Sequence, residues 1–431
     1  MFKRLLYTLV MYLGTPIIVY RLTSRGLRHR DYFSRWRERF GFFSPPPIKG
    51  SIWVHAVSVG EVNAALPLIE ALMRRYADHT CVVTTITPTG SERVRQVLGD
   101  RVFHVYLPYD LPASVRRFLD RVRPRLGVIM ETEIWPNLYH ECSARDIPLV
   151  IANGRLSERS LRGYRPVWSL AREALRRARF IAAQSAADAK RFEVLGAEAE
   201  RVCVAGNLKF DMTVPPEAGR VAARMRESWG VKRPVWIAAS THEGEELAVF
   251  EAHLEVLKRF PDALLLIAPR HPERFRAAEQ VGRHLGFNVA VRSIDWAPQA
   301  ATQCFVIDTM GELMNYFAAV DVAFVAGSIE PIGGHNVLEP AALGRPVLVG
   351  PQTFNFAEIT RTLVDAGGAV QFREASQLGG EVVALLRDEP QRSRMGAAAR
   401  DVFERERGAL ERTLRIVDEV LETTPDPGFP A

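Results

Sequence analysis

The sequence lacks the short motifs that mark several common enzyme classes. It contains no G-x-S-x-G nucleophile elbow, no G-x-x-x-x-G-K-[ST] phosphate loop and no D-x-D pair, which weakens hydrolase, P-loop and carboxylate-bound metal interpretations. Its four cysteines lie far apart and form no C-x-x-C, so neither a zinc site nor a disulfide framework is expected, and a reducing compartment fits. What remains is a chain of 431 residues with 47% hydrophobic content, long enough for two domains.

The sequence also lacks a full-length hydrophobic span. Its longest uncharged N-terminal run, LLYTLVMYLGTPIIVY (5–20), has 16 residues, whereas a bilayer span needs ~20. Lys3 and Arg4 precede the run, an arginine-rich segment with aromatic residues such as Tyr32 and Trp36 follows it, and no A-x-A cleavage site is present. We expect residues 1–43 to form an interfacial or marginally inserted membrane segment, with an ordinary buried helix as the alternative.

Net positive charge is confined to the N-terminus. Of the net charge of +6, residues 1–40 contribute +7, from nine basic and two acidic side chains, and the rest of the chain contributes −1. A nucleic-acid enzyme carries its positive charge along a binding groove. Nucleic acid is therefore not expected as a partner.

Strand-like and helix-like segments alternate through most of the chain, which predicts an α/β fold with mostly parallel sheets. The expected strands are residues 52–58, 81–87, 101–108, 125–131, 148–154, 180–185, 201–207, 235–241, 263–269, 288–293, 304–309, 322–327 and 346–350. We expect two Rossmann-like domains facing a central cleft, residues 44–210 and 235–431, joined by a linker at 211–234. Residues 390–422 are expected to form a charged amphipathic helical end that packs back onto either domain.

In the first half, acidic side chains and a lysine follow expected strands. Glu61 stands at a helix start, Glu131 and Glu133 follow another strand, and Lys209 ends the last one. Because ligands bind at the carboxyl ends of parallel strands, such a set is suited to activating a hydroxyl and binding an anionic donor. The alternative for Glu61 is that the helix dipole alone favours an acid in the first turn.

In the second half, polar and glycine-bearing loops follow the strands. APRHPERF (268–275) offers Arg270, His271 and Arg274 to a phosphate or carboxylate, and DTMGEL (308–313) opens a helix. His55, His242, His271 and His335 have no histidine partner at helical spacing, and we interpret each as a hydrogen-bonding loop residue rather than a metal ligand.

A glycine loop and a short helix, GSIEPIGGHNVLEPAALG (327–344), complete this set of loops. Asn336 is expected at the helix N-cap with Glu339 at capping-box spacing, and Gly344 is expected to end the helix. Two readings of Glu339 stay open: it caps its own helix, or it belongs to a nucleotide site.

With these loops placed, the sequence resembles the 3-deoxy-D-manno-oct-2-ulosonic acid (Kdo) transferases of lipopolysaccharide synthesis, which are GT-B glycosyltransferases. The resemblance covers nearly the whole chain and departs from the family pattern at none of its motifs. These motifs are WVHAVSVGEV, TTITPTG, PYDLP, METEIWPN, ANGRLSERS, GNLKFD, APRHPERF, DTMGEL and GSIEPIGGHNVLEPA.

The resemblance implies roles for residues of both halves. Glu61 matches the general base of the family's S-x-G-E motif, and Glu131 and Lys209 match residues that assist the transition state. Residues matching the CMP site follow in the second half: Pro269, Arg270, Met310, Gly311, Glu312, Asn336, Val337, Leu338 and Glu339.

The resemblance also implies the substrates and the location. The donor is CMP-Kdo, the acceptor is the lipid A precursor (lipid IVA), and the transfer inverts the anomeric carbon with no metal or other cofactor. The enzyme would lie on the cytoplasmic side of the cell inner membrane, with its oligomeric state open.

Two other function classes remain as alternatives. Another GT-B transferase or an epimerase using a UDP-sugar would share the architecture, and competition by CMP against UDP separates them. A membrane-peripheral binding protein without catalysis is the second, and intact Glu61 and Lys209 argue against it.

Overall fold

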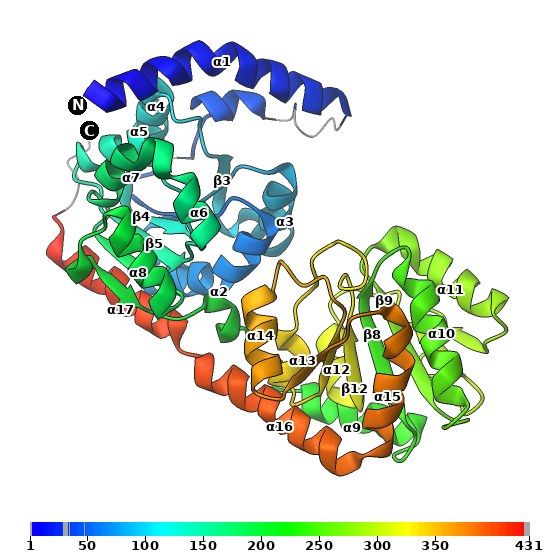
Figure 1. Ribbon diagram of the computed structural model, residues 1–431. Helices are drawn as coiled ribbons and strands as arrows, with labels where there is room; N and C mark the ends of the chain where they lie inside the picture. The colour runs from blue at the N-terminus through cyan, green and yellow to red at the C-terminus, as the bar shows by residue number, and fades with distance from the viewer. Residues whose placement is uncertain (1, 29–32, 34, 47, 426–431) are drawn as a thin grey trace. The chain divides into compact units, whose positions relative to one another are not determined.

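The computed structural model describes residues 2–28, 33, 35–46 and 48–425, so Tyr32 of the basic N-terminal segment lies outside the described residues. The chain divides into two compact units, each a parallel sheet covered by helices (Figure 1). Unit 1 comprises residues 1–212 and 407–431, and unit 2 comprises residues 213–406.

Unit 1 contains a seven-stranded sheet of order β3-β2-β1-β4-β5-β6-β7, in which every strand pair is parallel. The strands are β1 (Ser51–His55), β2 (Thr80–Thr85), β3 (Phe103–Tyr106), β4 (Pro124–Met130), β5 (Leu149–Gly154), β6 (Phe180–Ala183) and β7 (Val202–Val204). After β1 the chain builds outward to β3 and then returns to β4 on the other side of β1. The boundary of β1 and β4 is therefore a topological switch point, where ligands bind in open α/β sheets.

Two apolar layers cover the sheet of unit 1. Val54 faces the layer that includes α2 and α17, while Trp53 faces the layer that includes α4, α5, α7 and α8, as the two-residue period of a strand requires. The helices are α1 (Phe2–Arg28), η2 (Trp36–Phe40), α2 (Val59–Arg75), α3 (Pro88–Leu98), η3 (Gly99–Arg101), α4 (Pro112–Val122), α5 (Pro136–Ser143), α6 (Glu158–Gly163), η4 (Arg165–Val167), α7 (Trp168–Leu175), α8 (Ala186–Leu195), η5 (Ala199–Arg201), η6 (Leu208–Asp211) and α17 (Ala409–Thr423).

Unit 2 has a similar plan, except that β11 lies between β9 and β10: its sheet order is β10-β11-β9-β8-β12-β13-β14, again parallel throughout. The strands are β8 (Val235–Thr241), β9 (Leu264–Pro269), β10 (Val289–Val291), β11 (Cys304–Val306), β12 (Val322–Val325), β13 (Val347–Val349) and β14 (Ala369–Gln371). Its switch point lies at the boundary of β8 and β12.

Helices also cover both faces of the unit 2 sheet. Trp236 packs in the layer with α10, α11, α15 and α16, and Ile237 packs in the layer with α9 and α12. The helices are α9 (Ala218–Trp229), α10 (Glu245–Leu257), η7 (Pro272–Arg274), α11 (Phe275–His284), α12 (Leu313–Ala319), α13 (Leu338–Ala342), α14 (Ala357–Asp365), η8 (Ala375–Gln377), α15 (Leu378–Arg387) and α16 (Glu389–Glu406).

The structure differs from the sequence expectations at three places. The linker expected at 211–234 contains α9, which packs on α12. The expected helical end divides into two helices, of which α16 lies in unit 2 and α17 in unit 1. The carboxylate of Asp211 accepts hydrogen bonds from the backbone of Gly408 and Leu410, both at 2.8 Å, and so ties the start of α17 to unit 1. The edge strand β14 was not expected, because Ala369–Gln371 contains a single β-branched residue and no apolar run.

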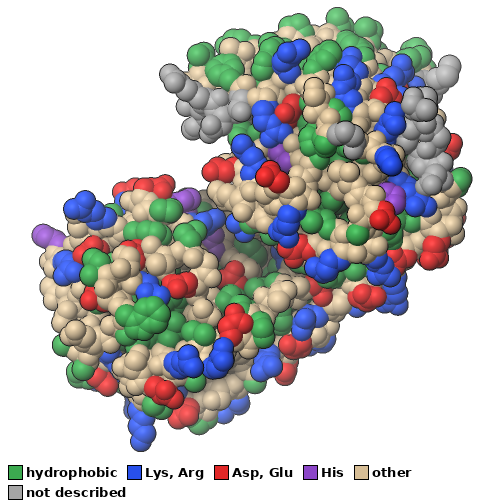
Figure 2. Space-filling view, turned by 180° about the vertical axis from the view of Figure 1, so that it is seen from behind, with side chains coloured by type: hydrophobic (Ala, Val, Ile, Leu, Met, Phe, Trp, Pro, Cys, Tyr) green, Lys and Arg blue, Asp and Glu red, His purple; other side chains and the backbone are tan. Residues whose placement is uncertain are grey.

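Helix α1 packs on unit 1 through its polar side chains and leaves apolar ones exposed. The Tyr7 hydroxyl donates to Asp110 Oδ2 (3.0 Å), and the Thr8 hydroxyl donates to Asn137 Oδ1 (3.0 Å). Leu9 and Leu13 are 54% and 70% exposed. Residues 2–24 are long and apolar enough to cross a membrane, and 6% of the most apolar stretch is buried. Figure 2 shows hydrophobic and Lys/Arg side chains side by side along the upper edge of unit 1.

Candidate functional site

Glu61 lies in the first turn of α2, directly after β1 and beside the switch point of unit 1. Its Oε2 accepts a hydrogen bond from the backbone N–H of Val57 (2.8 Å), and its Oε1 accepts one from the hydroxyl of Ser58 (3.2 Å). The carbonyl of Val57 accepts a bond from the Thr87 hydroxyl at the start of α3 (3.1 Å), so the loop is held from both sides. Glu61 therefore lies in the first turn of its helix, where the dipole favours an acid, and its carboxylate binds the two residues just before the helix. That role is compatible with a chemical one.

The electrostatic surroundings of Glu61 suit a proton acceptor. Burial, with smaller contributions from the negative charges of Glu131 and Glu133, raises its pKa to about 7, although the hydrogen bonds from Val57 and Ser58 act in the opposite direction. A general base works best when its pKa lies near the working pH. Glu61 meets that condition.

Glu131 and Glu133 follow β4, on the other side of the switch point from Glu61. Glu131 adopts the left-handed backbone region (φ 57°), which is uncommon outside glycine and turns the chain sharply at the strand end. Glu133 Oε2 accepts a hydrogen bond from the indole N–H of Trp135 (2.8 Å). Burial raises the pKa of Glu133, with a smaller contribution from Glu131. Two partly buried carboxylates thus interact electrostatically with Glu61.

Lys209 adds a cation to this acidic group. It lies in η6 after β7, where Asn207 Oδ1 accepts a hydrogen bond from the backbone N–H of Lys209 (3.0 Å). Burial lowers the pKa of its ammonium group, Arg155 lowers it as well, and the charges of Glu131 and Glu61 act in the opposite direction. The structure therefore places Glu61, Glu131 and Lys209 within electrostatic reach of one another, although they are far apart in sequence.

In unit 2, the expected nucleotide residues Pro269 and Arg270 lie at the end of β9. Pro269 is buried, and the backbone N–H of Arg270 donates to the carbonyl of Thr241 at the end of β8 (2.9 Å). Among the residues that the structure describes, no carboxylate forms an ion pair with Arg270. Arg274, also expected to be available to an anion, is instead paired with Glu246 and with Glu243 (3.3 Å).

The glycine loop before α13 holds the next four expected residues. Asn336 precedes the helix, which begins at Leu338 with Val337 in the cap position, so the expectation of Asn336 as N-cap was wrong by one residue. The backbone of Val337 is already helical (φ −77°, ψ −11°) without a side-chain cap of its own, and it is Asn336 that accepts a hydrogen bond from the helix N-terminus.

The side chains of this segment are largely buried. The Asn336 side-chain amide donates to Glu339 Oε1 (3.1 Å), and its Oδ1 accepts from the backbone N–H of Leu338 (3.2 Å). Val337 and Leu338 are 2% and 0% exposed. Burial raises the pKa of Glu339, while the bond from Asn336 and the charge of Arg270 lower it. Glu339 and Arg270 therefore belong to one electrostatic group.

The remaining expected residues lie before α12. Met310 is 65% exposed, Gly311 has a positive φ (85°), and Glu312 occupies the N-cap position. Glu312 Oε1 accepts a bond from Arg292 (3.2 Å), and its Oε2 accepts one from the Thr309 hydroxyl (2.5 Å). The side chain of Glu312 is thus fixed by its own neighbours.

Sequence reasoning treated three histidines of unit 2 as unrelated loop residues, yet the structure brings them together. The Nε2 atoms of His242 and His335 are 2.7 Å apart with the ring planes parallel within 5°, and the ring centroids of His242 and His271 are 5.3 Å apart. Each histidine follows one of the adjacent strands β9, β8 and β12. All three histidines follow predicted strands, which is the one feature of the sequence that could have suggested a cluster. The order of the strands, which makes the histidines neighbours, cannot be predicted from the sequence.

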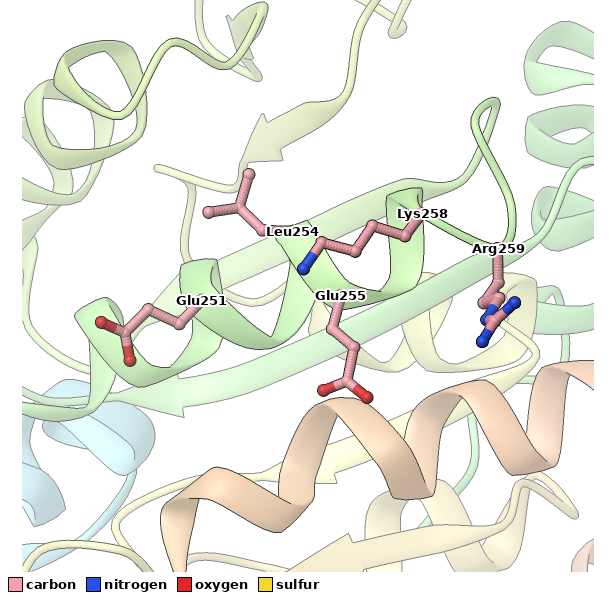
Figure 3. Close-up of a pocket in the computed structure, with 5 residues that line it drawn as sticks. All are labelled: Glu251, Leu254, Glu255, Lys258 and Arg259. Carbon is pink, nitrogen blue, oxygen red and sulfur yellow. The ribbon is translucent and has the colours of Figure 1, made fainter.

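Other features of the surface do not coincide with these residues. A shallow depression of about 650 Å³ lies along the outer face of α10 (Figure 3). Its lining consists of Glu251, Leu254, Glu255, Lys258 and Arg259. It contains none of the expected site residues and opens broadly to solvent. Within the described part of the chain, no group of three or more His, Cys, Asp or Glu is arranged to hold a metal ion.

Comparison with known proteins identifies the family. The family model described as 3-deoxy-D-manno-octulosonic-acid transferase matches residues 34–212. A 3-deoxy-D-manno-octulosonic acid transferase of Haemophilus influenzae is 42% identical over 97% of this chain and 99% of its own length. The chain belongs to the Kdo transferase family. The enzyme of the same name from Bordetella pertussis is 36% identical over 94% of this chain and 99% of its own length. The chain is therefore a glycosyltransferase.

Solved structures bear on the fold alone. UDP-GlcNAc 2-epimerase from Neisseria meningitidis aligns with 87% of this chain and 100% of its own, with a TM-score of 0.55 and 15% identity. Together with the two parallel sheets, this likeness confirms the GT-B class of two Rossmann-like domains for this Kdo transferase.

Proposed function

We propose that this Kdo transferase moves Kdo from CMP-Kdo to the lipid A precursor, lipid IVA, with inversion and with Glu61 as the general base. The observation that carries the proposal is the pKa of Glu61, which burial raises to about 7 beside the switch point of unit 1. A carboxylate with this pKa is partly ionised at neutral pH and is basic enough to accept a proton from a hydroxyl under attack.

The chemistry is a single displacement. The acceptor hydroxyl gives its proton to the Glu61 carboxylate as its oxygen bonds to the anomeric carbon of Kdo. The bond from that carbon to the phosphate oxygen breaks at the same time, and CMP leaves with the electron pair. Attack from the side opposite the leaving group inverts the configuration.

Charged side chains near Glu61 would assist this step. Lys209 carries a positive charge in a partly buried environment, where it is suited to offset the Kdo carboxylate or the departing phosphate. Glu131, which lies within electrostatic range of Lys209, would keep that ammonium oriented and charged.

In unit 2, the nucleotide is proposed to bind at the residues that match the family's CMP motifs. Pro269 ends β9 and Arg270 follows it, while Asn336 precedes α13 and Glu339 lies in its first turn. No metal is part of the proposal, because the leaving group is a nucleoside monophosphate whose charge a guanidinium such as Arg270 can offset.

The location on the cytoplasmic side of the inner membrane is proposed from helix α1. Its outer face exposes Leu5, Leu6, Leu9 and Leu13, each at least 53% exposed. Basic residues such as Lys3 and Arg21 flank this face in the sequence. Apolar side chains bordered by cations suit a surface of anionic lipids, where the acceptor lipid is found.

Mass spectrometry of the product tests the proposal. The purified enzyme, incubated with CMP-Kdo and tetraacylated lipid A precursor, is expected to add the mass of Kdo, with CMP rather than UDP competing for binding. Glu61→Gln should lower the turnover rate about 10³-fold while CMP still binds, because the amide cannot accept the proton. Turnover near the wild-type rate in Glu61→Gln would remove Glu61 as the base.

A further inference from the structure

The imidazole pair, His242 and His335, lies at the switch point of unit 2. His242 directly follows β8, and His335 belongs to the loop after β12, the neighbouring strand. The rings are parallel within 5°, with centroids 5.0 Å apart, and their Nε2 atoms share a hydrogen bond of 2.7 Å. Two residues 93 positions apart thus form one unit.

The surroundings of the imidazole pair are cationic. Burial, with smaller contributions from His242, Arg270 and His271, lowers the pKa of His335 to about 3. Burial also lowers the pKa of His242, with contributions from His271 and Arg270. The carboxylate that acts electrostatically on Arg270 is Glu339, whose own pKa is raised by burial. In the described residues, neither Arg270 nor the imidazole pair has an ion-pair partner. An anion would therefore meet the guanidinium of Arg270, with which no described carboxylate forms an ion pair, beside the two imidazoles.

The hydrogen bond between the two rings requires that at least one Nδ1 atom carries a proton, which it can donate to such an anion. One ring must donate through Nε2–H, so the other accepts on Nε2 and, when neutral, carries its proton on Nδ1. Across the described part of the chain, neither Nδ1 atom has a hydrogen-bond partner. At least one Nδ1–H is thus available to an oxygen ligand, whichever ring carries it.

A single buried carboxylate holds both histidine segments in place. Glu245, which is 0% exposed, accepts bonds from the backbone N–H groups of Gly327 (2.8 Å), Ser328 (3.0 Å), Ile329 (2.9 Å) and His242 (3.1 Å). The strand-end loops that carry the pair are therefore tied to one anchor. Groups fixed before a ligand arrives lose no free energy to reorganisation when it binds.

Gly327 gives His335 its space. A Cβ atom at residue 327 would lie 2.6 Å from Cδ2 of His335, and the positive φ of 69° disfavours any other residue. The carbonyl of Gly327 accepts a bond from the backbone N–H of Gly334 (2.6 Å), which closes the loop next to His335. The glycine is thus required by the position of the ring.

We propose that the imidazole pair and Arg270 bind the phosphate group of the donor nucleotide. The inference rests on the proposed function, because it takes CMP-Kdo as the donor. Arg270 and Asn336, both placed in the CMP site by the family resemblance, are next to His271 and His335 in sequence. The carboxylate of Kdo offers the same oxyanion chemistry, so the experiment separates the two groups.

The test compares dissociation constants of CMP, cytidine and CMP-Kdo for the full-length protein by calorimetry. His335→Asn should weaken CMP binding about 10-fold and leave cytidine binding within about twofold, since cytidine has no phosphate. His284→Asn, on the exposed end of α11, is the matched control and should change neither. Gly327→Ala should also weaken the binding of CMP more than that of cytidine, because the added Cβ displaces His335 while the imidazole itself is kept.

Three outcomes would overturn the proposal. Equal loss of CMP and cytidine affinity would mean that the substitution distorts the unit. A lower affinity for CMP-Kdo with an unchanged affinity for CMP would show that the pair binds the carboxylate of the sugar. Unchanged binding of all three would show that the pair contacts no ligand. If the wild-type protein does not bind CMP, the proposed function itself fails, which is a different result.

Discussion

The two units share a fold but carry opposite chemistry at the same position. In unit 1, Glu61 and Glu131 follow the strands β1 and β4 that flank the switch point. In unit 2, His242 and His335 follow the equivalent strands β8 and β12. Burial raises the pKa of Glu61 to about 7 and lowers that of His335 to about 3. One physical cause, desolvation of the charged form, thus moves both groups toward neutrality.

This difference shows how one architecture supports two tasks. A carboxylate whose pKa is raised by burial is suited to act as a base, and imidazoles whose pKa values are lowered by burial are suited to donate hydrogen bonds beside a permanent cation. The strands and helices fix where a side chain lies, and the type of residue that follows the strand decides whether that side chain is acidic or basic. The predictions below act on the group of Glu61, Glu131 and Lys209 in unit 1 (the acidic site), on the imidazole pair with Arg270 in unit 2 (the basic site), and on helix α1.

Among the variants below, the one that removes the cation from the acidic site should have the largest effect. Lys209→Met is expected to lower the turnover rate about 100-fold, because a partly buried positive charge that stabilises developing negative charge is lost. Steady-state transfer to lipid A precursor measures the change. Lys190→Met, whose side chain is 74% exposed on α8, is the control and should retain full activity. A turnover rate within threefold of wild type for Lys209→Met would contradict the role of Lys209.

Removing the anchor of the basic site should weaken the fold of unit 2. Glu245→Ala leaves four backbone N–H groups without their acceptor, and the expected loss in free energy of unfolding is about 3 kcal/mol. Urea denaturation followed by the fluorescence of the buried Trp236 measures it. Glu251→Ala, on the exposed face of the same helix, should change stability by less than about 0.5 kcal/mol. Equal stability of the two variants would show that Glu245 is not the anchor.

The sequence predicts most of the architecture because parallel strands buried on both faces read as apolar runs. Thirteen of the expected ranges correspond to strands β1 to β13, while the three-residue edge strand β14 was not expected. The placement of Glu61 in the first turn of a helix was also expected, from the acid that directly follows a strand and a glycine.

Contacts between residues far apart in the chain could not be predicted from the sequence. Glu245 reads as an ordinary helix-start acid, yet it binds a loop more than 80 residues away. The imidazole pair forms because β8 and β12 are neighbours in the sheet. Arg274 was expected to be available to an anion, and its partner Glu246 was missed because it lies 28 residues earlier. In each case the missing information is which strand ends become neighbours.

The pH dependence of transfer tests the electrostatics of the acidic site. Glu61 must be ionised to accept a proton, so kcat/KM should rise about tenfold per pH unit below about 7 and level off above it. Glu131→Gln removes a like charge and should shift this limb to lower pH by about half a unit, whatever it does to the maximal rate. Glu70→Gln, at the exposed side of α2, is the control for the limb position. A shift to higher pH in Glu131→Gln would contradict the coupling to Glu61.

The smallest effects concern helix α1, which belongs to unit 1. Tyr7→Phe removes one hydrogen bond to Asp110, which keeps its bonds from the backbone of Asn137 and Leu138. The expected cost is about 1 kcal/mol in the docking of α1, seen as faster amide hydrogen exchange within the helix. Partition to vesicles of anionic lipid should stay unchanged in this variant, since Tyr7 is directed at the protein, whereas Leu9→Ser should lower it several-fold because Leu9 is 54% exposed. Partition that responds to Tyr7→Phe but not to Leu9→Ser would reverse the assignment of the two faces of α1.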